Sequence, residues 1–212
     1  MEHIRILHEP SAAEPFLVLD KPAGLPTAPL AEGEDCALQQ ALDLYPALRA
    51  VTGRKAIERG LVHRIDTATR GCVLIAATQS AYERLLAAQK SRQFYKHYTA
   101  LVDRIFDTTA LLDGFPPQTD AMKHFNATAA PEAPITLSSR FRAYGAHNSA
   151  VRPVTDESGR AAQKKCAPAL YETTITLYRV SVPSAAEAQN AFRAECEICA
   201  GYRHQVRCHL AW

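Results

Sequence analysis

The sequence has no long hydrophobic run. Its apolar stretches fall well short of the about 18 residues that a membrane-spanning helix needs. The first residues, among them Glu2, His3 and Arg5, also lack the apolar segment of a signal peptide. We therefore expect a cytoplasmic protein with no membrane partner.

The sequence also has little excess charge of either sign. Lysine and arginine number 24 against 22 acidic residues, and a formal net charge of +2 does not by itself indicate a nucleic-acid partner. The distribution is more informative, because cations collect in residues 54–70 and 201–212. The cations are Arg54, Lys55, Arg59, Arg64 and Arg70, against Glu58 and Asp66, in the first stretch, and Arg203 and Arg207, with no acidic residue, in the second.

Closely spaced cysteines are scarce. The six cysteines are scattered singly except for Cys196 and Cys199, a distribution typical of reduced, buried thiols. With His204 and Cys208, this pair comes within one residue of the spacing of a zinc knuckle, which would also bind nucleic acid. If residues 192–199 form a strand, however, the two cysteines point to opposite faces and cannot share a metal ion. We therefore expect structural cysteines and no metal site.

The length predicts one domain, with two lobes at most, and an apolar fraction of 47% can build a sizeable core. Strands are predicted where short apolar runs are bounded by turn residues, and helices where apolar residues recur every three or four positions. The predicted strands span residues 16–19, 72–77, 95–102, 140–144, 171–180 and 192–199, and the predicted helices begin at caps Asp35 and Ser80 and end at Pro46 and near Ser91. Residues 107–134 lose this periodicity and indicate loops around at most one short element, and residues 156–163 an exposed hairpin loop.

Residues 63–71, His-Arg-Ile-Asp-Thr-Ala-Thr-Arg-Gly, form a polar segment that leads directly into the apolar run 72–77. This pattern predicts a loop that presents side chains at the mouth of a buried strand. Asp66 lies between Arg64 and Arg70, whose positive charge favours the ionised carboxylate, a form that suits a nucleophile better than a general acid. Taken alone, the loop also allows a simpler interpretation, in which Asp66 only stabilises a turn and the arginines are ordinary surface residues.

This segment resembles the signature of the RluA family of pseudouridine synthases, His-Arg-Leu-Asp-x-x-Thr-Ser-Gly. The matching positions are His63, Arg64, Asp66, Thr69 and Gly71. Ile65 stands in place of Leu, and Arg70 in place of a small Ser.

Three further stretches resemble motifs of the same family, in the same order. Residues 20–24, Asp-Lys-Pro-Ala-Gly, are similar to Asn-Lys-Pro-x-Gly, with Asp20 in place of Asn. Residues 96–100 match Lys-x-Tyr-x-Ala. Residues 201–211 resemble Gly-Arg-Thr-His-Gln-Ile-Arg-Val-His-Leu-Ala, with Tyr-Arg in place of Arg-Thr. Four motifs in order argue against a chance resemblance.

The resemblance implies that the chain isomerises uridine to pseudouridine in structured ribosomal or transfer RNA, without a metal ion or other cofactor. By resemblance, Asp66 is the essential carboxylate, Tyr98 stacks on the uracil and Arg207 pairs with Asp66. The residues leave open whether Asp66 acts on the anomeric carbon, on carbon 6 of the base or at the 2′ position of the sugar. The expected RNA-binding residues are His63, Arg64, Arg70, Lys96 and Arg203.

The implied fold is the α+β catalytic fold of pseudouridine synthases, a mixed, largely antiparallel sheet with flanking helices and loops. We expect residues 1–212 to form a single, monomeric catalytic domain with no separate N-terminal RNA-binding domain. Family members normally continue beyond the fourth motif. We therefore expect a domain that is truncated at its C-terminal end, with an exposed sheet edge that weakens the fold.

Two other functions remain open. A protein derived from a synthase could bind RNA without catalysis, although a pure binder gains nothing from a carboxylate in a cleft that faces phosphates. A hydrolase of another glycosidic bond would need a second carboxylate, and Glu58 or Asp20 within about 5 to 10 Å of Asp66 would supply it.

Overall fold

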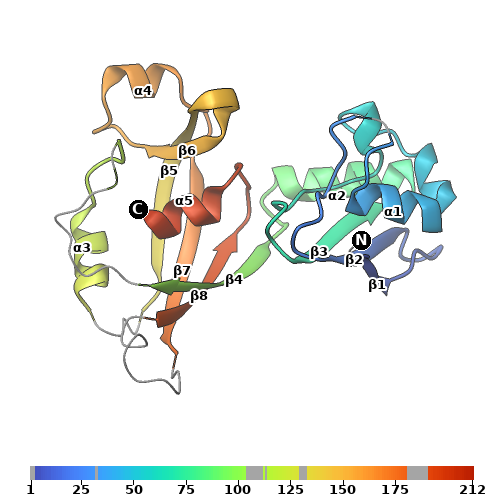
Figure 1. Ribbon diagram of the computed structural model, residues 1–212, viewed down its shortest axis with the longest axis horizontal. Helices are drawn as coiled ribbons and strands as arrows, with labels where there is room; N and C mark the ends of the chain where they lie inside the picture. The colour runs from blue at the N-terminus through green and yellow to red at the C-terminus, as the bar shows by residue number, and fades with distance from the viewer. Residues whose placement is uncertain (1–2, 32, 104–111, 113, 129–132, 181–190) are drawn as a thin grey trace. The chain divides into compact units, whose positions relative to one another are not determined.

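The computed structural model describes residues 3–31, 33–103, 112, 114–128, 133–180 and 191–212. Its internal contacts divide the chain into two compact units, Met1–Phe94 and Tyr95–Trp212 (Figure 1). The single domain expected for residues 1–212 stays a prediction.

The first unit contains a three-stranded antiparallel sheet in the order β1-β2-β3. These strands are Arg5–His8, Phe16–Lys21 and Gly71–Ala76. β2 and β3 pair along their whole length, with Lys21 opposite Gly71. This register places the end of the Asp66 loop beside the end of β2. The sequence predicts β2 and β3 but not the short edge strand β1, whose apolar residues are only the pair Ile6 and Leu7.

Helices cover both faces of β3. α1, Ala37–Leu44, shares a hydrophobic cluster with Val73 and Ile75, whereas α2, Gln79–Lys90, shares another with Ala76. Because successive residues of a strand point to opposite faces, these two helices cover opposite sides of the strand. Two 3-10 helices, η1 (Pro46–Ala50) and η2 (Ala56–Glu58), lie between α1 and β3 in the sequence.

Both helices of the first unit begin at caps other than the predicted ones. Cys36, not Asp35, caps α1, because its sulfur accepts the backbone N–H three residues further on, at 3.3 Å. The carboxylate of Asp35 instead accepts from the side chain of Gln40 at 3.0 Å. Thr78, not Ser80, caps α2 in the same way as Cys36 caps α1, at 3.2 Å. The apolar spacing thus locates each helix but not its first residue.

Residues 60–62 run beside β3 and lead into the Asp66 loop. Val62 donates its backbone N–H to the carbonyl of Leu74 at 3.1 Å, and Ala76 donates to the carbonyl of Gly60 at 2.8 Å. A Cβ atom on Gly60 would overlap with the carbonyl oxygen of Ala76. This close approach of two backbones therefore requires glycine.

The second unit contains a five-stranded sheet in the order β4-β8-β7-β5-β6, and every pairing between these strands is antiparallel. The strands are β4 (Lys96–Asp103), β5 (Ile135–Tyr144), β6 (Ala150–Val154), β7 (Tyr171–Arg179) and β8 (Ala191–Ile198). The sequence does not predict β6, and β5 begins five residues before the predicted strand. The prediction of a loop over residues 156–163 is wrong in part, because a short helix, α4, occupies Arg160–Lys164. Its polar residues carry no hydrophobic periodicity that would reveal it.

Two helices lie on one face of this sheet (Figure 1). They are α3, Asp120–Ala127, and α5, Gln205–Ala211. Met122 of α3 and Leu210 of α5 belong to one hydrophobic cluster with Ile175 of β7. α3 is a short element of the kind expected within residues 107–134, of which 107–111, 113 and 129–132 lie outside the described residues.

β8 shows the alternation that its sequence predicts. The buried side chains are Phe192, Ala194, Cys196 and Ile198, and the exposed ones are Arg193, Glu195 and Glu197. The antiparallel sheets with helices on their faces confirm the predicted α+β class. Within the described ranges, no helix combines the length and the hydrophobicity needed to cross a membrane.

Replacing Gly60 with Ala should destabilise the first unit, because the new Cβ forces the backbone away from Ala76. Overpacking of this kind costs about 1–3 kcal/mol, and thermal unfolding followed by circular dichroism should show a lower midpoint. Gly159→Ala is the matched control, because a Cβ there meets no atom within 4 Å. Equal midpoints for the two variants would contradict the close packing at Gly60.

Candidate functional site

Asp66 lies in the loop between η2 and β3, where it begins a β-turn. The backbone N–H of Thr69 donates to the carbonyl of Asp66 at 2.9 Å and closes the turn over residues 67 and 68. Asp66 is half-buried, whereas the two central residues of the turn are exposed. The backbone of Asp66 therefore stabilises a turn, as the simpler interpretation expects. The hydrogen bond of the turn uses the carbonyl of Asp66 and not its carboxylate.

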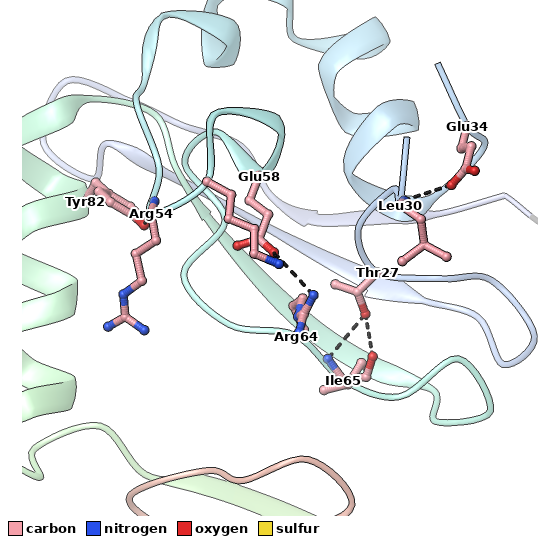
Figure 2. A network of polar contacts seen from close by, with 9 residues as sticks. Thr27, Leu30, Glu34, Arg54, Glu58, Arg64, Ile65 and Tyr82 are labelled. Carbon is pink, nitrogen blue, oxygen red and sulfur yellow. Dashed lines mark hydrogen bonds and ion pairs between the residues drawn. The ribbon is translucent and has the colours of Figure 1, made fainter. Parts of the chain in front are cut away.

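The residue before Asp66 is held by a single hydroxyl group. Thr27 donates through Oγ1 to the carbonyl of Ile65 at 2.6 Å and accepts the backbone N–H of the same residue at 3.2 Å. Figure 2 shows this hydroxyl between the two backbone groups of Ile65. The side chain of Ile65 also packs against the hydrophobic cluster of the first unit. Both its backbone and its side chain are thus fixed.

The residue after Asp66 is held by the Lys-Pro-Ala-Gly stretch at the end of β2. The carbonyl of Thr67 accepts from the backbone N–H of Gly24 at 2.8 Å and from Nζ of Lys21 at 3.1 Å. Lys21 is 0% exposed, and its ammonium group also donates to the carbonyls of Pro22 at 2.8 Å and Leu25 at 2.7 Å. A lysine is almost never buried to this extent without such partners. This motif therefore supports the Asp66 loop.

Arg64, two residues before Asp66, is paired with a carboxylate from η2. Its Nη1 lies 3.2 Å from Oε1 of Glu58 (Figure 2). The same oxygen lies 3.6 Å from Nζ of Lys55. One recessed carboxylate, 16% exposed, thus holds two more exposed cations.

Arg70, at the other end of the loop, has a similar environment. Its Nη2 lies 3.5 Å from Oδ2 of Asp20, and Nη2 of Arg5 lies 3.2 Å from the same oxygen. Asp20 and Glu58, the two carboxylates that a glycosidic hydrolase would recruit, are therefore each engaged with two cations.

His63 and Gly71 are the first and last residues of the segment 63–71. The ring of His63 packs against Phe94, with ring centroids 5.7 Å apart and planes inclined by 55°. Gly71 has φ of +138°, a positive value that a side chain would rarely allow.

In the second unit, β4 carries Lys96 and Tyr98. Tyr98 lies opposite Cys196 of β8 and is half-buried against the cluster that includes α3 and α5. Lys96 packs on Gly201, where an added Cβ would lie 2.9 Å from its Nζ. Burial lowers the pKa of Lys96 from its ordinary value, and the charge of Cys199 opposes that shift. The third motif therefore contacts the start of the fourth.

The fourth motif forms a turn followed by α5. His204 adopts a left-handed backbone, with φ of 58°, immediately before the helix. Gln205 accepts the backbone N–H of Tyr202 at 2.9 Å through Oε1. Its side-chain amide donates to the carbonyl of Glu172 at 2.8 Å and to Oγ1 of Thr173 at 3.1 Å. This buried glutamine thus ties the turn and the helix to β7.

His209, one helical turn after Gln205, is buried between two hydroxyl groups. Its Nε2 lies 2.9 Å from Oγ of Ser139 on β5, and its Nδ1 lies 2.7 Å from Oγ1 of Thr173 on β7. Burial lowers the pKa of His209 to about 4, so the ring is neutral near pH 7. A neutral imidazole has one donor and one acceptor nitrogen and can satisfy both hydroxyls. Arg207 lies two residues from each anchor and is exposed on the opposite side of the helix.

The two residues that depart from the fourth motif both make internal contacts. Tyr202 stacks on Phe141 of β5, with ring centroids 5.1 Å apart and an angle of 12° between the planes. Arg203 donates through Nη1 to the carbonyl of Asn148 at 3.0 Å, in the 3-10 helix η3, Ala146–Asn148. The RNA-binding role predicted for Arg203 stays a prediction.

The cysteines of the proposed zinc spacing lie in ordinary secondary structure. Cys196 is buried within β8, and Cys199 follows the end of that strand. Cys208 is buried on α5 and donates through Sγ to the carbonyl of Val151 at 3.5 Å. Burial raises the pKa of the Cys196 and Cys208 thiols to about 12, which disfavours the thiolate that a metal ion needs. In the part of the chain that the structure describes, no group of three or more His, Cys, Asp or Glu residues is placed to hold a metal ion.

The structure places the predicted site residues in two groups. The first unit carries His63, Arg64, Asp66 and Arg70, all in one loop, and the second carries Lys96, Tyr98, Arg203 and Arg207. The pairing of Arg207 with Asp66 would join residues of different units and stays a prediction. Sequence reasoning misses Thr27 and the anchors Gln205 and His209, although their four-residue spacing would have placed both anchors on one face of a predicted helix.

A profile of the RNA pseudouridylate synthase family matches residues 15–212. The chain belongs to this family. The family predicted from the four motifs is therefore confirmed.

Related proteins agree with this assignment. The chain is 29% identical over 199 residues to ribosomal large subunit pseudouridine synthase D of Zymomonas mobilis, in an alignment that covers 93% of the chain and 50% of that protein. It is 30% identical over 202 residues to the mitochondrial pseudouridylate synthase RPUSD4 of Xenopus tropicalis, covering 93% of the chain and 54% of that protein. The chain thus spans about half the length of these pseudouridylate synthases.

Solved structures of the same family share the fold. Human RNA pseudouridylate synthase domain containing 1 superposes with a TM-score of 0.59 at 16% identity, over 98% of this chain and 64% of the human chain. Human RNA pseudouridylate synthase domain containing 4 gives a TM-score of 0.56 at 18% identity, over 97% and 63% of the two chains. The α+β fold is therefore that of the pseudouridylate synthases.

Thr27→Val should destabilise the first unit, because it leaves the backbone N–H and carbonyl of Ile65 without the hydroxyl that pairs with both. A buried group that loses its partner costs about 1–3 kcal/mol, so the midpoint of urea unfolding should fall. Thr136→Val is the matched control, because that hydroxyl pairs with Thr174 on an exposed face of the second sheet. If both variants unfold at the same urea concentration, the proposed support of the loop by Thr27 is wrong.

The lowered pKa of His209 should make the second unit less stable in mild acid. An unfolded chain has a histidine pKa near 6.5, so between about pH 4 and 6.5 the unfolded state binds more protons than the folded state. The contribution of neutral His209 is complete above about pH 6.5 and is lost as the pH falls toward 4, by about 2 kcal/mol at pH 5. Urea unfolding at pH 7.5 and pH 5 should therefore show a larger loss of stability for the wild type than for His209→Asn.

His97→Gln is the control for this measurement, because the side chain of His97 is 72% exposed. It should keep the larger pH dependence of the wild type. The same loss between pH 7.5 and pH 5 in the wild type and in His209→Asn would show that the buried ring does not govern acid stability.

Proposed function

We propose that this chain isomerises uridine to pseudouridine in structured RNA, with Asp66 as the essential carboxylate and without a cofactor. The observation that carries the proposal is the Asp66 loop, fixed by hydrogen bonds on both sides, in a member of the RNA pseudouridylate synthase family. The reaction breaks the glycosidic bond, turns the uracil and joins its carbon 5 to the sugar. It needs a reactive group that keeps its position while the base moves.

The support of the loop agrees with such a role for Asp66. A displacement of about 1 Å in a catalytic group can reduce a rate about a hundredfold. Thr27 and Lys21 restrain the backbone on either side of Asp66, and Asp66 itself is half-buried. A turn that served only to connect η2 with β3 would not need a fully buried lysine beneath it.

Tyr98 and Arg207 have assigned roles in this proposal. Tyr98 stacks on the uracil after the base leaves the RNA stack, because an aromatic face holds a base without fixing its rotation. Arg207 pairs with Asp66 and aims it, since a guanidinium matches the two oxygens of a carboxylate. The exposed position of Arg207 on an anchored helix supports this role.

Ribosomal RNA is the substrate that we favour over transfer RNA. Several relatives are named as pseudouridine synthases of the ribosomal large subunit. The cations at both ends of the Asp66 loop, together with Lys96 and Arg203, would contact the RNA backbone.

The alternative function is RNA binding without catalysis, and substitution of Asp66 separates the two. Asp66→Asn should abolish the formation of pseudouridine in unmodified ribosomal RNA labelled with tritium at carbon 5 of uridine, by at least about 100-fold. Asp43→Asn is the matched control, because Asp43 pairs with Arg49 at 2.8 Å on the exposed surface of the same unit and should retain activity. Product formation by Asp66→Asn would exclude the assigned role. No product from the wild type, with RNA affinity equal to that of the variant, would establish the binding protein instead.

A further inference from the structure

Arg5, Asp20 and Arg70 form a cluster with unusual exposure. The side chain of Asp20 is 15% exposed, whereas those of Arg5 and Arg70 are 72% and 71% exposed. Both guanidinium groups contact the same oxygen, Oδ2 of Asp20, at 3.2 and 3.5 Å. One recessed negative charge thus holds two exposed positive charges, and the cluster keeps a net charge of +1.

The strands of the first sheet determine this arrangement. Asp20 lies in the central strand, opposite Arg5 of β1 on one side and opposite Cys72 of β3 on the other. Arg70 immediately precedes β3, whose first residue, Gly71, lies opposite Lys21. Backbone pairing therefore brings both arginines to the two sides of Asp20, although residues 20 and 70 are 50 positions apart.

Such a cluster contributes little to the stability of the folded protein. An exposed ion pair adds little to the stability of a protein, and a second cation on the same carboxylate adds repulsion between the cations. A guanidinium has five N–H donors, of which a single contact with Asp20 uses a small part. The cluster thus presents two donor-rich, positively charged groups to the solvent, both in contact with Asp20.

We propose that Arg5 and Arg70 bind a phosphodiester group of the substrate RNA and that Asp20 is the residue that positions them. Phosphate oxygens are the ligands that paired guanidinium groups recognise best, through parallel N–H donors. The proposal rests on the function proposed above, because it assigns a contact to the RNA that Asp66 acts on.

The position of the cluster defines which phosphate it binds. Arg70 is four residues from Asp66, and four residues span at most about 14 Å. The phosphate therefore belongs to the target nucleotide or to one of its near neighbours. By fixing the strand there, the cluster helps to select the uridine that reaches Asp66.

Two departures from the family motifs meet in this cluster. Asp20 stands in place of the usual Asn, Arg70 stands in place of the usual Ser, and the ion pair joins them. This ion-pair cluster is therefore a feature of this particular chain and not of the general family motifs.

The test measures substrate affinity and turnover separately in the full chain. Arg5→Ala/Arg70→Ala should raise KM for ribosomal RNA about tenfold with kcat within about twofold, because the phosphate contact is made equally in the ground state and the transition state. The slope of affinity against salt concentration should fall by about 1 to 2. Arg49→Ala with Asp43→Asn removes another Arg–Asp pair of the first unit and should leave all three quantities unchanged.

The Asp20→Asn variant makes the test more specific, because an effect of charge alone and a loss of positioning change the RNA affinity in opposite directions. The loss of one negative charge should tighten RNA binding if charge alone matters. If Asp20 positions the two arginines, the same change should instead weaken binding and raise KM. Tighter binding by Asp20→Asn would overturn the positioning role, and an unchanged KM and salt slope for the double arginine variant would overturn the phosphate site.

RNA affinity is also measured with each change placed on Asp66→Asn. This measurement reports on the phosphate site whether or not the chain forms pseudouridine, so failure of the site and failure of the proposed reaction are distinguishable. Circular dichroism of each variant identifies any loss of binding that follows from unfolding.

Discussion

The fixed position of Asp66 depends on hydrogen bonds to the backbone of its two neighbours, Ile65 and Thr67. Neither neighbour could be held by the turn alone, because its single hydrogen bond joins Asp66 to Thr69. The last residue of β2 and the segment after this strand supply the missing partners, a hydroxyl for Ile65 and an ammonium group with a backbone amide for Thr67. Burying an ammonium group is costly unless it is paired. The three carbonyl groups that accept from the Lys21 ammonium group offset the cost of its burial. One of these contacts, with Thr67, restrains the loop.

The second unit uses the same physical device for Arg207. Gln205 and His209 are buried and fully engaged with β5 and β7, and they hold α5 against the sheet on either side of the exposed arginine. Apolar contacts around Leu210 would permit α5 to slide or rotate, whereas directional hydrogen bonds of a buried network define one orientation. In both units, a buried polar contact positions an accessible charged group.

The sequence predicts those helices and strands whose hydrophobic pattern lies in a few consecutive residues. The alternation along β8 and the apolar run of β3 are contained in a few consecutive residues, and both strands appear where expected. The contacts that support the site join distant residues, across 38 positions for Thr27 and Ile65 and 70 positions for Ser139 and His209. No local pattern contains that information. The motifs therefore identify the residues of the candidate site, and the structure identifies the residues that hold them.

The distribution of charge shows the same limit, and it gives a role to carboxylates at the proposed RNA-binding surface. A net charge of +2 indicates little affinity for nucleic acid, and a carboxylate that faces a phosphate reduces this affinity further. Glu58 and Asp20 are only 16% and 15% exposed, however, and each holds two cations that are more exposed than itself. A phosphate approaching from solvent meets the cations first. A recessed carboxylate can thus organise a cationic surface for RNA while lowering the net charge of the protein.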